Sequence, residues 1–334
     1  MRTGLLASIG SCTTGVLTAT LSRAAHAAEP HVSFLDPQGP IAAMQRTHFV
    51  EVLTLLAVFV ALPIFVLIPW LAWRYRYGAT TSGYRPRWQA SIVFEVLAWS
   101  GPAVIVTMLA VLVWRSTITV DPYRPLPSDQ PPLRIQVVGY DWKWLFIYPD
   151  EGVASIGVMP VPVGRPLALE LTSATVMQSL LIPSLGSQIY AMGGMTTRLH
   201  LQADRPGRFM GENTMYNGDG FHQQRFTTVG MSADAFRGWV QRATSDGMPL
   251  DRSTFDLIAQ RATFDALKDA LHPVGDFDGG LYFNRVDPNA FHDILMATMH
   301  GSDRAGSSPS DPRGPSMMRP SPGCRRRRAN RRCP

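Results

Sequence analysis

Few stretches of this chain combine reactive residue types with an informative position. Residues 211–224, GENTMYNGDGFHQQ, form a loop rich in Gly and Asn between the run PGRF and the apolar run RFTTVGM. The residues that favour the left-handed backbone conformations of a tight turn between two strands are Asn213, Asn217, Gly218 and Gly220. Residues 21–320 contain no cysteine. The loop therefore offers amides and a histidine to any chemistry, and no thiolate.

The second candidate is Glu95, an acidic residue just inside the start of an apolar run. An ionisable group within a membrane segment is costly, so it commonly has a function. Two interpretations of Glu95 remain open, a proton-entry residue and a carboxylate solvated at the membrane surface. Glu51, at the outer end of an earlier apolar run, is expected to be interfacial.

Composition favours a protein with both membrane and soluble parts. Of 334 residues, 46% are hydrophobic and 17% are charged, which is apolar for a soluble protein and polar for a membrane bundle. The formal net charge of +6 depends on a cluster of six arginines within residues 325–332. The rest of the chain is near neutral, so no nucleic-acid partner is expected.

The N-terminus predicts an export signal over residues 1–27, followed by a periplasmic segment over residues 28–48. Arg2 supplies the positive start, a small and apolar run follows, and Ala25-His26-Ala27 is typical of a cleavage site. A retained third membrane helix and a lipoprotein signal ending at Cys12 are the alternatives. If cleavage follows Ala27, Cys12 is absent from the mature protein.

Two apolar runs predict transmembrane helices over residues 49–74 and 91–115, since each exceeds the roughly 20 residues that cross about 30 Å of hydrocarbon. The connection, residues 75–90, and its flank carry four arginines and no acidic residue. By the positive-inside rule this loop is cytoplasmic. Everything after residue 115 is then expected on the outer, periplasmic face.

After a Pro-rich linker, residues 116–132, the pattern becomes strand-like. Residues 133–230 contain short β-prone runs separated by Pro and Gly turns, which predicts a Greek-key sandwich or barrel. The strand that begins this region places Trp142, Trp144, Phe146 and Tyr148 on one side at a period of two. Residues 231–300 predict a helical, aromatic-rich arm, and residues 301–334 are expected to be a disordered basic tail with Cys324 and Cys333 of undetermined state.

The order of these segments resembles subunit II of the haem-copper respiratory oxidases. The motifs that carry the resemblance are DWKWLFIY from Asp141, LLIPSLGSQIYAMGGM within residues 180–195, and PGRF from Pro206. The resemblance covers roughly residues 35–300. It implies a membrane-anchored protein of mixed class, with an N-terminal two-helix transmembrane hairpin, a periplasmic cupredoxin-like Greek-key β-barrel and a C-terminal helical arm.

Members of this family that oxidise cytochrome c hold a dinuclear copper centre on two Cys, two His, a Met and a Glu carbonyl. Soft thiolates and imidazoles suit copper. The matching positions in this chain carry, in order, Gln178, Asn213, Met215, Asn217, Phe221 and Gln224. None of the ligand side chains is present, so this resemblance implies a degenerate site that binds no metal. A substitute site would have to come from His200, His222, Met192, Met195 or Met215.

The pattern is similar to the quinol-oxidising branch of the family, the cytochrome bo-type ubiquinol oxidases. The resemblance implies that this chain binds no cofactor, and that haems and one copper belong to subunit I, with ubiquinol as the substrate of the complex. Implied partners are subunits I, III and IV and membrane lipid, with no role for cytochrome c. The implied location is the bacterial inner membrane, crossed more than once.

The resemblance also implies roles for three side chains. Glu95, in the motif E-x-x-x-W-x-x-P, matches the entrance of a proton pathway into the large subunit. Trp142 and Trp144 have no copper to serve and are expected in packing and subunit contact. A membrane-tethered copper-delivery or assembly module is the alternative function, and it requires clustered metal ligands. A cytochrome c oxidase subunit is excluded by the missing cysteines.

Overall fold

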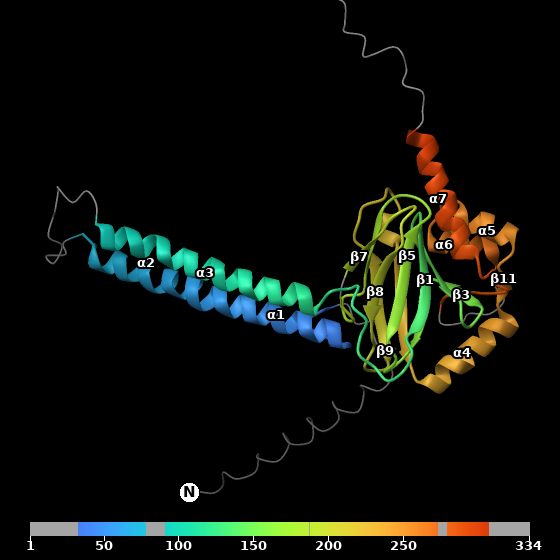
Figure 1. Ribbon diagram of the computed structural model, residues 1–334, viewed down its shortest axis with the longest axis horizontal. Helices are drawn as coiled ribbons and strands as arrows, with labels where there is room; N and C mark the ends of the chain where they lie inside the picture. Colours follow the sequence, from blue (N-terminus) through green and yellow to red (C-terminus); the bar gives the residue numbers. More distant parts are fainter. Residues whose placement is uncertain (1–32, 78–90, 187, 273–278, 307–334) are drawn as a thin grey trace, which may run out of the picture.

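The computed structural model describes residues 33–77, 91–186, 188–272 and 279–306, with side chains described as far as residue 299. A long helical hairpin extends from one side of a β-sandwich, and further helices cover the opposite side (Figure 1). The predicted export signal, most of the loop 75–90 and most of the basic tail lie outside the described residues. Six residues assigned to the tail, 301–306, are helical, because the helix α7 (Ala290–Gly306) continues through them.

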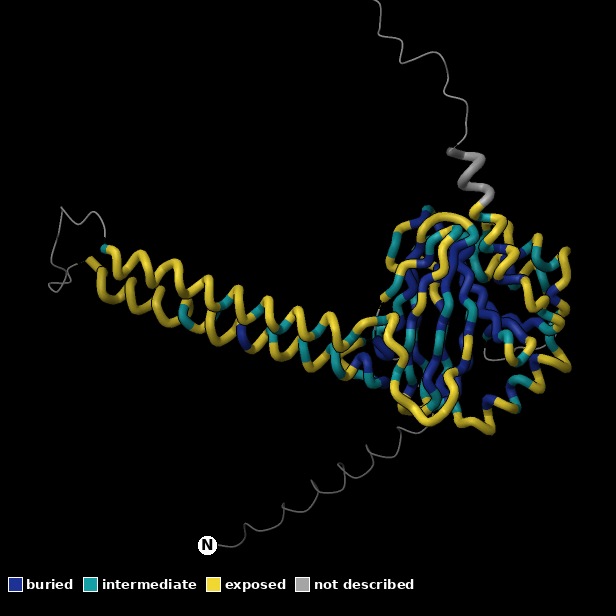
Figure 2. The backbone as a smooth tube through the Cα atoms, in the orientation of Figure 1, coloured by how far each residue is buried: buried dark blue, intermediate teal, exposed yellow. Residues whose placement is uncertain are grey.

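The hairpin consists of two helices long and apolar enough to cross a membrane, Pro40–Arg74 and Ile92–Thr119. The first comprises α1 (Pro40–Leu56), a π-helical turn η1 (Ala57–Ala61) and α2 (Leu62–Arg74), and the second is α3 (Ile92–Thr119). Pro63 has no N–H for the preceding turn, and the widened π turn lies directly before it. Figure 2 shows that most of the hairpin is exposed, as expected for a surface that meets lipid or another protein.

Each helix of the hairpin extends beyond the predicted span. α1 begins at Pro40, inside the segment 28–48, and α3 ends at Thr119, inside the linker 116–132. The start of α1 is attached to the sandwich, because Gln38 N donates to Ser184 O at 2.8 Å and Ala42 N donates to Leu185 O at 3.2 Å. Apolar helix residues and a docked first turn together explain why the helix starts earlier than the hydropathy pattern indicates.

Two sheets form the sandwich. The seven-stranded sheet has the order β11-β12-β3-β2-β1-β5-β8, and the five-stranded sheet has the order β4-β10-β9-β6-β7. The first sheet comprises β1 (Leu133–Tyr140), β2 (Lys143–Tyr148), β3 (Val153–Ile156), β5 (Leu167–Ser173), β8 (Thr197–Leu201), β11 (Met248–Pro249) and β12 (Leu281–Asn284). The second comprises β4 (Val158–Pro162), β6 (Gln178–Leu181), β7 (Gln188–Ala191), β9 (Gly207–Asn213) and β10 (Arg225–Met231). The sequence predicts a Greek-key sandwich or barrel for this region, and the all-β domain is confirmed in the form of a sandwich of two sheets.

The core lies between the sheets. Trp144, Phe146 and Tyr148 of β2 point into it, and the ring centroids of Phe146 and Phe226 lie 4.8 Å apart. Leu145 and Ile147 of the same strand point to the other side, where they are also buried. β2 is thus buried on both faces, which explains why its sequence is almost continuously apolar.

The C-terminal arm comprises α4 (Ala233–Asp246), α5 (Arg252–Ala259), α6 (Phe264–Leu271) and α7, and it also contributes β11 and β12. Three helices of the arm, α5 to α7, cover the outer face of the seven-stranded sheet, and α4 packs against the core between the sheets. Ser232 caps α4 by accepting a hydrogen bond from Ala235 N, as its sequence predicts. Trp239 of α4 packs against Tyr148 with ring centroids 5.1 Å apart. The arm therefore shares the core of the sandwich.

The predicted helical arm is confirmed, and it also contains the strand β12, residues 281–284, which pairs with β3. The strands β3 and β7, of four residues each, lie outside the β-prone runs 157–163, 166–172, 178–182, 196–202 and 225–231 that the sequence indicates. Four residues are too few to show a period of two clearly. These short strands form because they pair with neighbouring strands.

Candidate functional site: an amide cluster at the end of the sandwich

Four amide side chains meet at one end of the sandwich. Gln178 begins β6, Asn213 ends β9, Asn217 lies in the loop that follows, and Gln224 directly precedes β10. β9 and β10 are antiparallel and pair as far as Glu212 with Arg225, so the chain must return between them through residues 214–224. All four amides are buried, with exposed fractions of 0%, 4%, 9% and 1% in chain order. The structure therefore brings Gln178 together with three amides of a segment that begins 35 residues later in the sequence.

Gln224 is the centre of this amide cluster. Its Oε1 accepts from Asn213 Nδ2 at 3.0 Å and from Asn217 Nδ2 at 2.7 Å. Its Nε2 donates to the backbone oxygen of Tyr140 at 3.3 Å and to Gln178 Oε1. Gln178 Nε2 donates to the same Tyr140 oxygen at 3.1 Å. The cluster thus joins both sheets, because Tyr140 belongs to β1.

Asn213 fixes the start of the loop. Its Oδ1 accepts from Ser179 N at 2.9 Å and from Met215 N at 3.0 Å, and its Nδ2 also donates to Met215 O at 2.7 Å. A side-chain amide that bonds the backbone two residues further on forms an Asx turn. Asn213 therefore turns the chain out of β9 while its side chain remains in the cluster.

The loop is longer than the tight turn predicted from its Gly and Asn content. It contains a 3-10 turn, η2 (Phe221–Gln223), before β10 begins. Of the four residues expected to be left-handed, only Gly218 has a positive φ, at 110°. Gly220 has a φ of −86°, and Asn213 remains in the strand. Hydrogen bonds from both asparagines to Gln224 take the place of the conformational role that the sequence indicated.

Met215 and Phe221, the remaining two positions that the resemblance implies for a degenerate site, lie at the edge of the cluster. Met215 is partly buried and takes part through its backbone N–H and carbonyl, as described for Asn213. Phe221 opens the 3-10 turn, and its ring packs on Tyr216 with centroids 5.7 Å apart. Neither side chain joins the hydrogen-bonded network.

The donor set of the amide cluster does not fit a copper pair. Three of the four amide groups use both nitrogen and oxygen to hold one another or the backbone, and neutral amides lack the charge and softness of thiolates. The fourth, Asn217, has an Oδ1 that finds no hydrogen-bond partner among the described residues. No group of three or more His, Cys, Asp or Glu side chains with metal-binding spacing occurs within the described ranges.

The two histidines considered for a substitute site are used elsewhere or exposed. His200 Nδ1 lies 3.1 Å from the backbone oxygen of Pro122, and its backbone N–H donates to that oxygen as well. His200 thus attaches the linker after α3 to β8. His222 is exposed, with its Nε2 3.2 Å from Gln223 Nε2. The structure does not bring these histidines to the amide cluster as bonding partners.

Trp142 and Trp144 have different environments. Trp144 is 1% exposed and lies in the core, so it packs as expected, while its buried side chain offers no surface for the expected contact with another subunit. Trp142 lies in the turn before β2 and not on the strand, with a φ of 66°. Its Nε1 donates to the backbone oxygen of Asn217 at 3.3 Å. The aromatic stripe inferred from a period of two therefore begins at Trp144.

The sequence pattern missed Lys143 and Arg261. Lys143 is 2% exposed, and its Nζ donates to Gln260 O at 2.7 Å and to Ala262 O at 3.0 Å. Burial lowers the pKa of Lys143 to about 8, and the nearby Asp141 carboxylate opposes the shift. Arg261 lies over the Trp142 ring, with its guanidinium carbon 4.8 Å from the centroid. In the sequence, the one signal for Lys143 is its position as a charged residue within an apolar strand.

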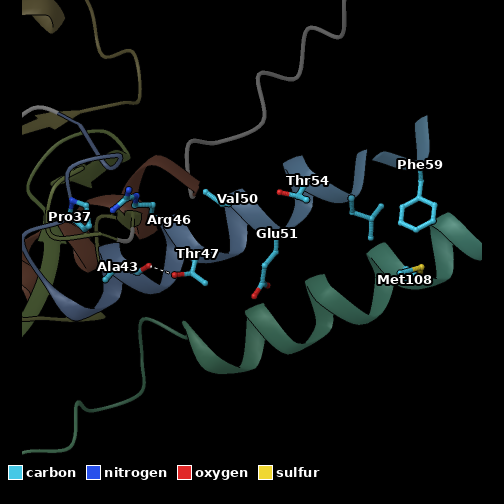
Figure 3. A pocket seen from close by; sticks show the side chains of 10 residues that line it. Pro37, Ala43, Arg46, Thr47, Val50, Glu51, Thr54, Phe59 and Met108 are labelled. Atoms are coloured by element: carbon cyan, nitrogen blue, oxygen red, sulfur yellow. Dashed lines mark hydrogen bonds between the residues drawn. The ribbon is translucent and has the colours of Figure 1, made fainter. Parts of the chain in front are cut away.

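Glu95 is exposed in the first turn of α3, at the end of the hairpin far from the sandwich (Figure 1). The opposite end of the hairpin has an open groove of about 670 Å³ between α1 and α3, whose lining includes Arg46, Glu51, Phe59 and Met108. Figure 3 shows Glu51 on α1 beside α3. His48 Nδ1 lies 3.3 Å from Glu51 Oε2, in keeping with an interfacial carboxylate.

Comparison with known proteins gives consistent relatives. No family model matches the chain. The ubiquinol oxidase subunit 2 of Acetobacter aceti is 36% identical over 84% of this chain and 87% of its own length. The cytochrome bo(3) ubiquinol oxidase subunit 2 of Pseudomonas aeruginosa is 36% identical over 83% of this chain and 80% of its own. The quinol oxidase subunit 2 of Bacillus subtilis is 31% identical over 68% and 71%.

The chain combines an apolar helical hairpin, a β-sandwich and a helical arm, and the relatives that it matches are named second subunits of quinol oxidases. Within that class, the identity over most of both chains decides the family. The chain belongs to the ubiquinol oxidase subunit 2 family.

Proposed function

We propose that this chain is the copper-free subunit II of a terminal oxidase that takes its electrons from ubiquinol. The complex oxidises two quinols to two quinones and reduces one O₂ to two waters, and it pumps protons across the membrane. The observation that carries this proposal is the amide cluster, which occupies the four positions where copper-bearing relatives need their thiolate, imidazole and thioether side chains. Family membership supports it.

The amide cluster offers no group that relays an electron. Amide side chains have no accessible second oxidation state, and the cluster commits its nitrogens to hydrogen bonds. A soluble donor such as cytochrome c would therefore find no acceptor on this subunit. Electrons from quinol must enter the partner, subunit I, which carries the haems and a single copper. This chain itself contributes no redox centre.

The chain then acts as an anchored scaffold. The exposed hairpin supplies an apolar surface for subunit I and lipid, and subunits III and IV complete the complex. We place both helices across the bacterial inner membrane with the sandwich in the periplasm. The arginines of residues 74–87 keep the connection on the cytoplasmic side.

Purification of the intact complex tests the electron donor. Turnover with ubiquinol, absence of turnover with reduced cytochrome c, and one copper for the haems of subunit I are the expected results. Cytochrome c turnover together with copper beyond that single atom would refute the proposal.

We assign Glu95 to the entrance of a proton pathway at the cytoplasmic end of α3. Its support is its exposed carboxylate, which is available to a neighbouring subunit, and its distance from the sandwich. Glu95→Gln is expected to slow turnover and proton uptake because the neutral amide cannot pick up and release a proton. The matched control is Glu51→Gln on α1, at the opposite end of the hairpin. Equal rates for Glu95→Gln and the unaltered complex would remove this role.

A further inference from the structure

The outer side of the loop 214–224 contacts a bulky residue in an unfavourable backbone conformation. Trp142 has a φ of 66°, a region that side chains larger than that of Gly, Asn or Asp rarely adopt because Cβ approaches the backbone. Such a conformation persists only where the surroundings over-determine it. The contacts of Trp142 therefore show what holds this corner of the molecule together.

The indole ring of Trp142 packs against two glycines of the loop. A Cβ atom at Gly220 would lie 2.2 Å from Trp142 Cδ2, and a Cβ atom at Gly218 would lie 3.5 Å from Cζ2. The ring therefore lies directly against the backbone of the loop. The bond from Trp142 Nε1 to Asn217 O adds a fixed point between these glycines.

The C-terminal arm reaches the same indole. Arg261, between α5 and α6, places its guanidinium carbon 4.8 Å from the Trp142 centroid, and its Nη2 would lie 2.6 Å from a Cβ atom at Gly218. A cation over an indole is attracted by the ring quadrupole. The Asp141 carboxylate, 3.9 Å from Arg261 Nε, favours the same position of the guanidinium.

Lys143 holds the backbone on both sides of Arg261. Its Nζ accepts no bond and donates three, to Gln260 O, Ala262 O and Asp141 O, at 2.7, 3.0 and 3.3 Å. An ammonium group has three N–H donors, so the carbonyl set matches the charged form. Lys143 and Trp142 are adjacent in sequence. Lys143 holds the backbone on both sides of Arg261, and Trp142 contacts the Arg261 side chain.

We propose that residues 260–262 are a latch through which the C-terminal arm keeps the loop 214–224 ordered in the absence of a metal. The amide cluster holds this loop from the inside, and the latch holds it from the outside through Trp142. The order of the loop, and the shape of this end of the sandwich, then depend on an arm segment distant in sequence. The inference is independent of which electron donor the complex uses.

Hydrogen exchange, followed by mass spectrometry on the purified full-length chain in its complex, tests the latch. Arg261→Ala and Lys143→Met are each expected to raise exchange of the amides in residues 214–224 about threefold to thirtyfold. Peptides from β1 and β5 serve as the internal reference and should not change. Arg261→Lys keeps the charge without the planar guanidinium, and we expect a smaller rise.

The matched control is Arg237→Ala on the exposed face of α4, where Arg237 pairs only with the neighbouring Asp234. This variant should leave exchange of the loop unchanged. Two results would overturn the proposal: unaltered loop exchange in Arg261→Ala, or an equal rise in the β1 and β5 peptides, which would indicate general destabilisation. If Lys143→Met does not fold, the Arg261 variants still decide the test, because Arg261 is a surface residue.

Discussion

Replacing Gln224 with leucine removes the centre of the amide cluster with little change in volume. Asn213 Nδ2 keeps its bond to Met215 O, and Tyr140 O keeps its bond from Gln178 Nε2. Two buried groups lose the one partner that the structure describes for each, namely Asn217 Nδ2 and Gln178 Oε1. Gln224→Leu therefore leaves one buried donor and one buried acceptor without a hydrogen-bond partner.

The expected cost follows from these two groups. A buried polar group left unpaired costs about 1–3 kcal/mol, so the two groups in Gln224→Leu should lower the free energy of unfolding by about 2–6 kcal/mol. For a unit of the size of the sandwich with its arm, each kcal/mol shifts the melting temperature by about 2–4 °C. The melting temperature should therefore fall by about 4–24 °C.

Thermal unfolding of the purified full-length chain in detergent, followed by near-ultraviolet circular dichroism, measures this change. Asn217→Ala is the matched control, because it removes the stranded donor together with the already unpartnered Oδ1. The double variant should lose less stability than the sum of the single variants, by about 1–3 kcal/mol. A melting temperature of Gln224→Leu within about 1 °C of the unaltered chain would refute the reasoning.

Three further predictions concern the arm and the turn before β2. Gly220→Ala would place Cβ against the Trp142 indole, and we expect a loss of about 1–3 kcal/mol with altered tryptophan fluorescence; unchanged emission and stability would contradict the contact. Trp239→Ala should cost about 3–5 kcal/mol and expose residues 240–272 to proteases, because this buried ring packs against three others; resistance equal to that of the unaltered chain would count against it. For Lys143, the folded pKa of about 8 lies below the ordinary value of 10.5, so the unfolded chain binds more protons between these values. Stability relative to Lys143→Met should therefore rise from pH 8 to pH 10.5 in thermal melts, and a constant or falling difference would be inconsistent with the lowered pKa.

Hydrophobicity and periodicity were sufficient to predict the architecture. The two apolar runs predict the hairpin because only helices of that length satisfy every backbone group in hydrocarbon. The capping residue Ser232 and the spacing of Phe236 and Trp239 predict α4 and its buried face. These features depend on neighbours within a few residues, so a local pattern contains them.

Short strands and side-chain contacts across the fold could not be predicted in this way. In the sequence, the residues of β12 resemble the rest of the aromatic-rich arm, and only the pairing with β3 identifies them as a strand. The alternating pattern predicts that Trp142 continues a strand. The two-residue turn between β1 and β2 instead places its side chain against the loop 214–224. Lys143 and Arg261 are 118 positions apart, and no periodicity relates them.

The sequence by itself, through its resemblance to the oxidase subunits, predicts amides at positions where a copper site would need thiolates, and it thus indicates which class of electron donor to expect. Only the tertiary structure decided what these amides do. Gln178, Asn213, Asn217 and Gln224 can form one network only because β1 and β9 end, and β6 and β10 begin, at the same end of the sandwich. Hydrogen bonds require partners within about 3 Å, and packing of two sheets sets that distance.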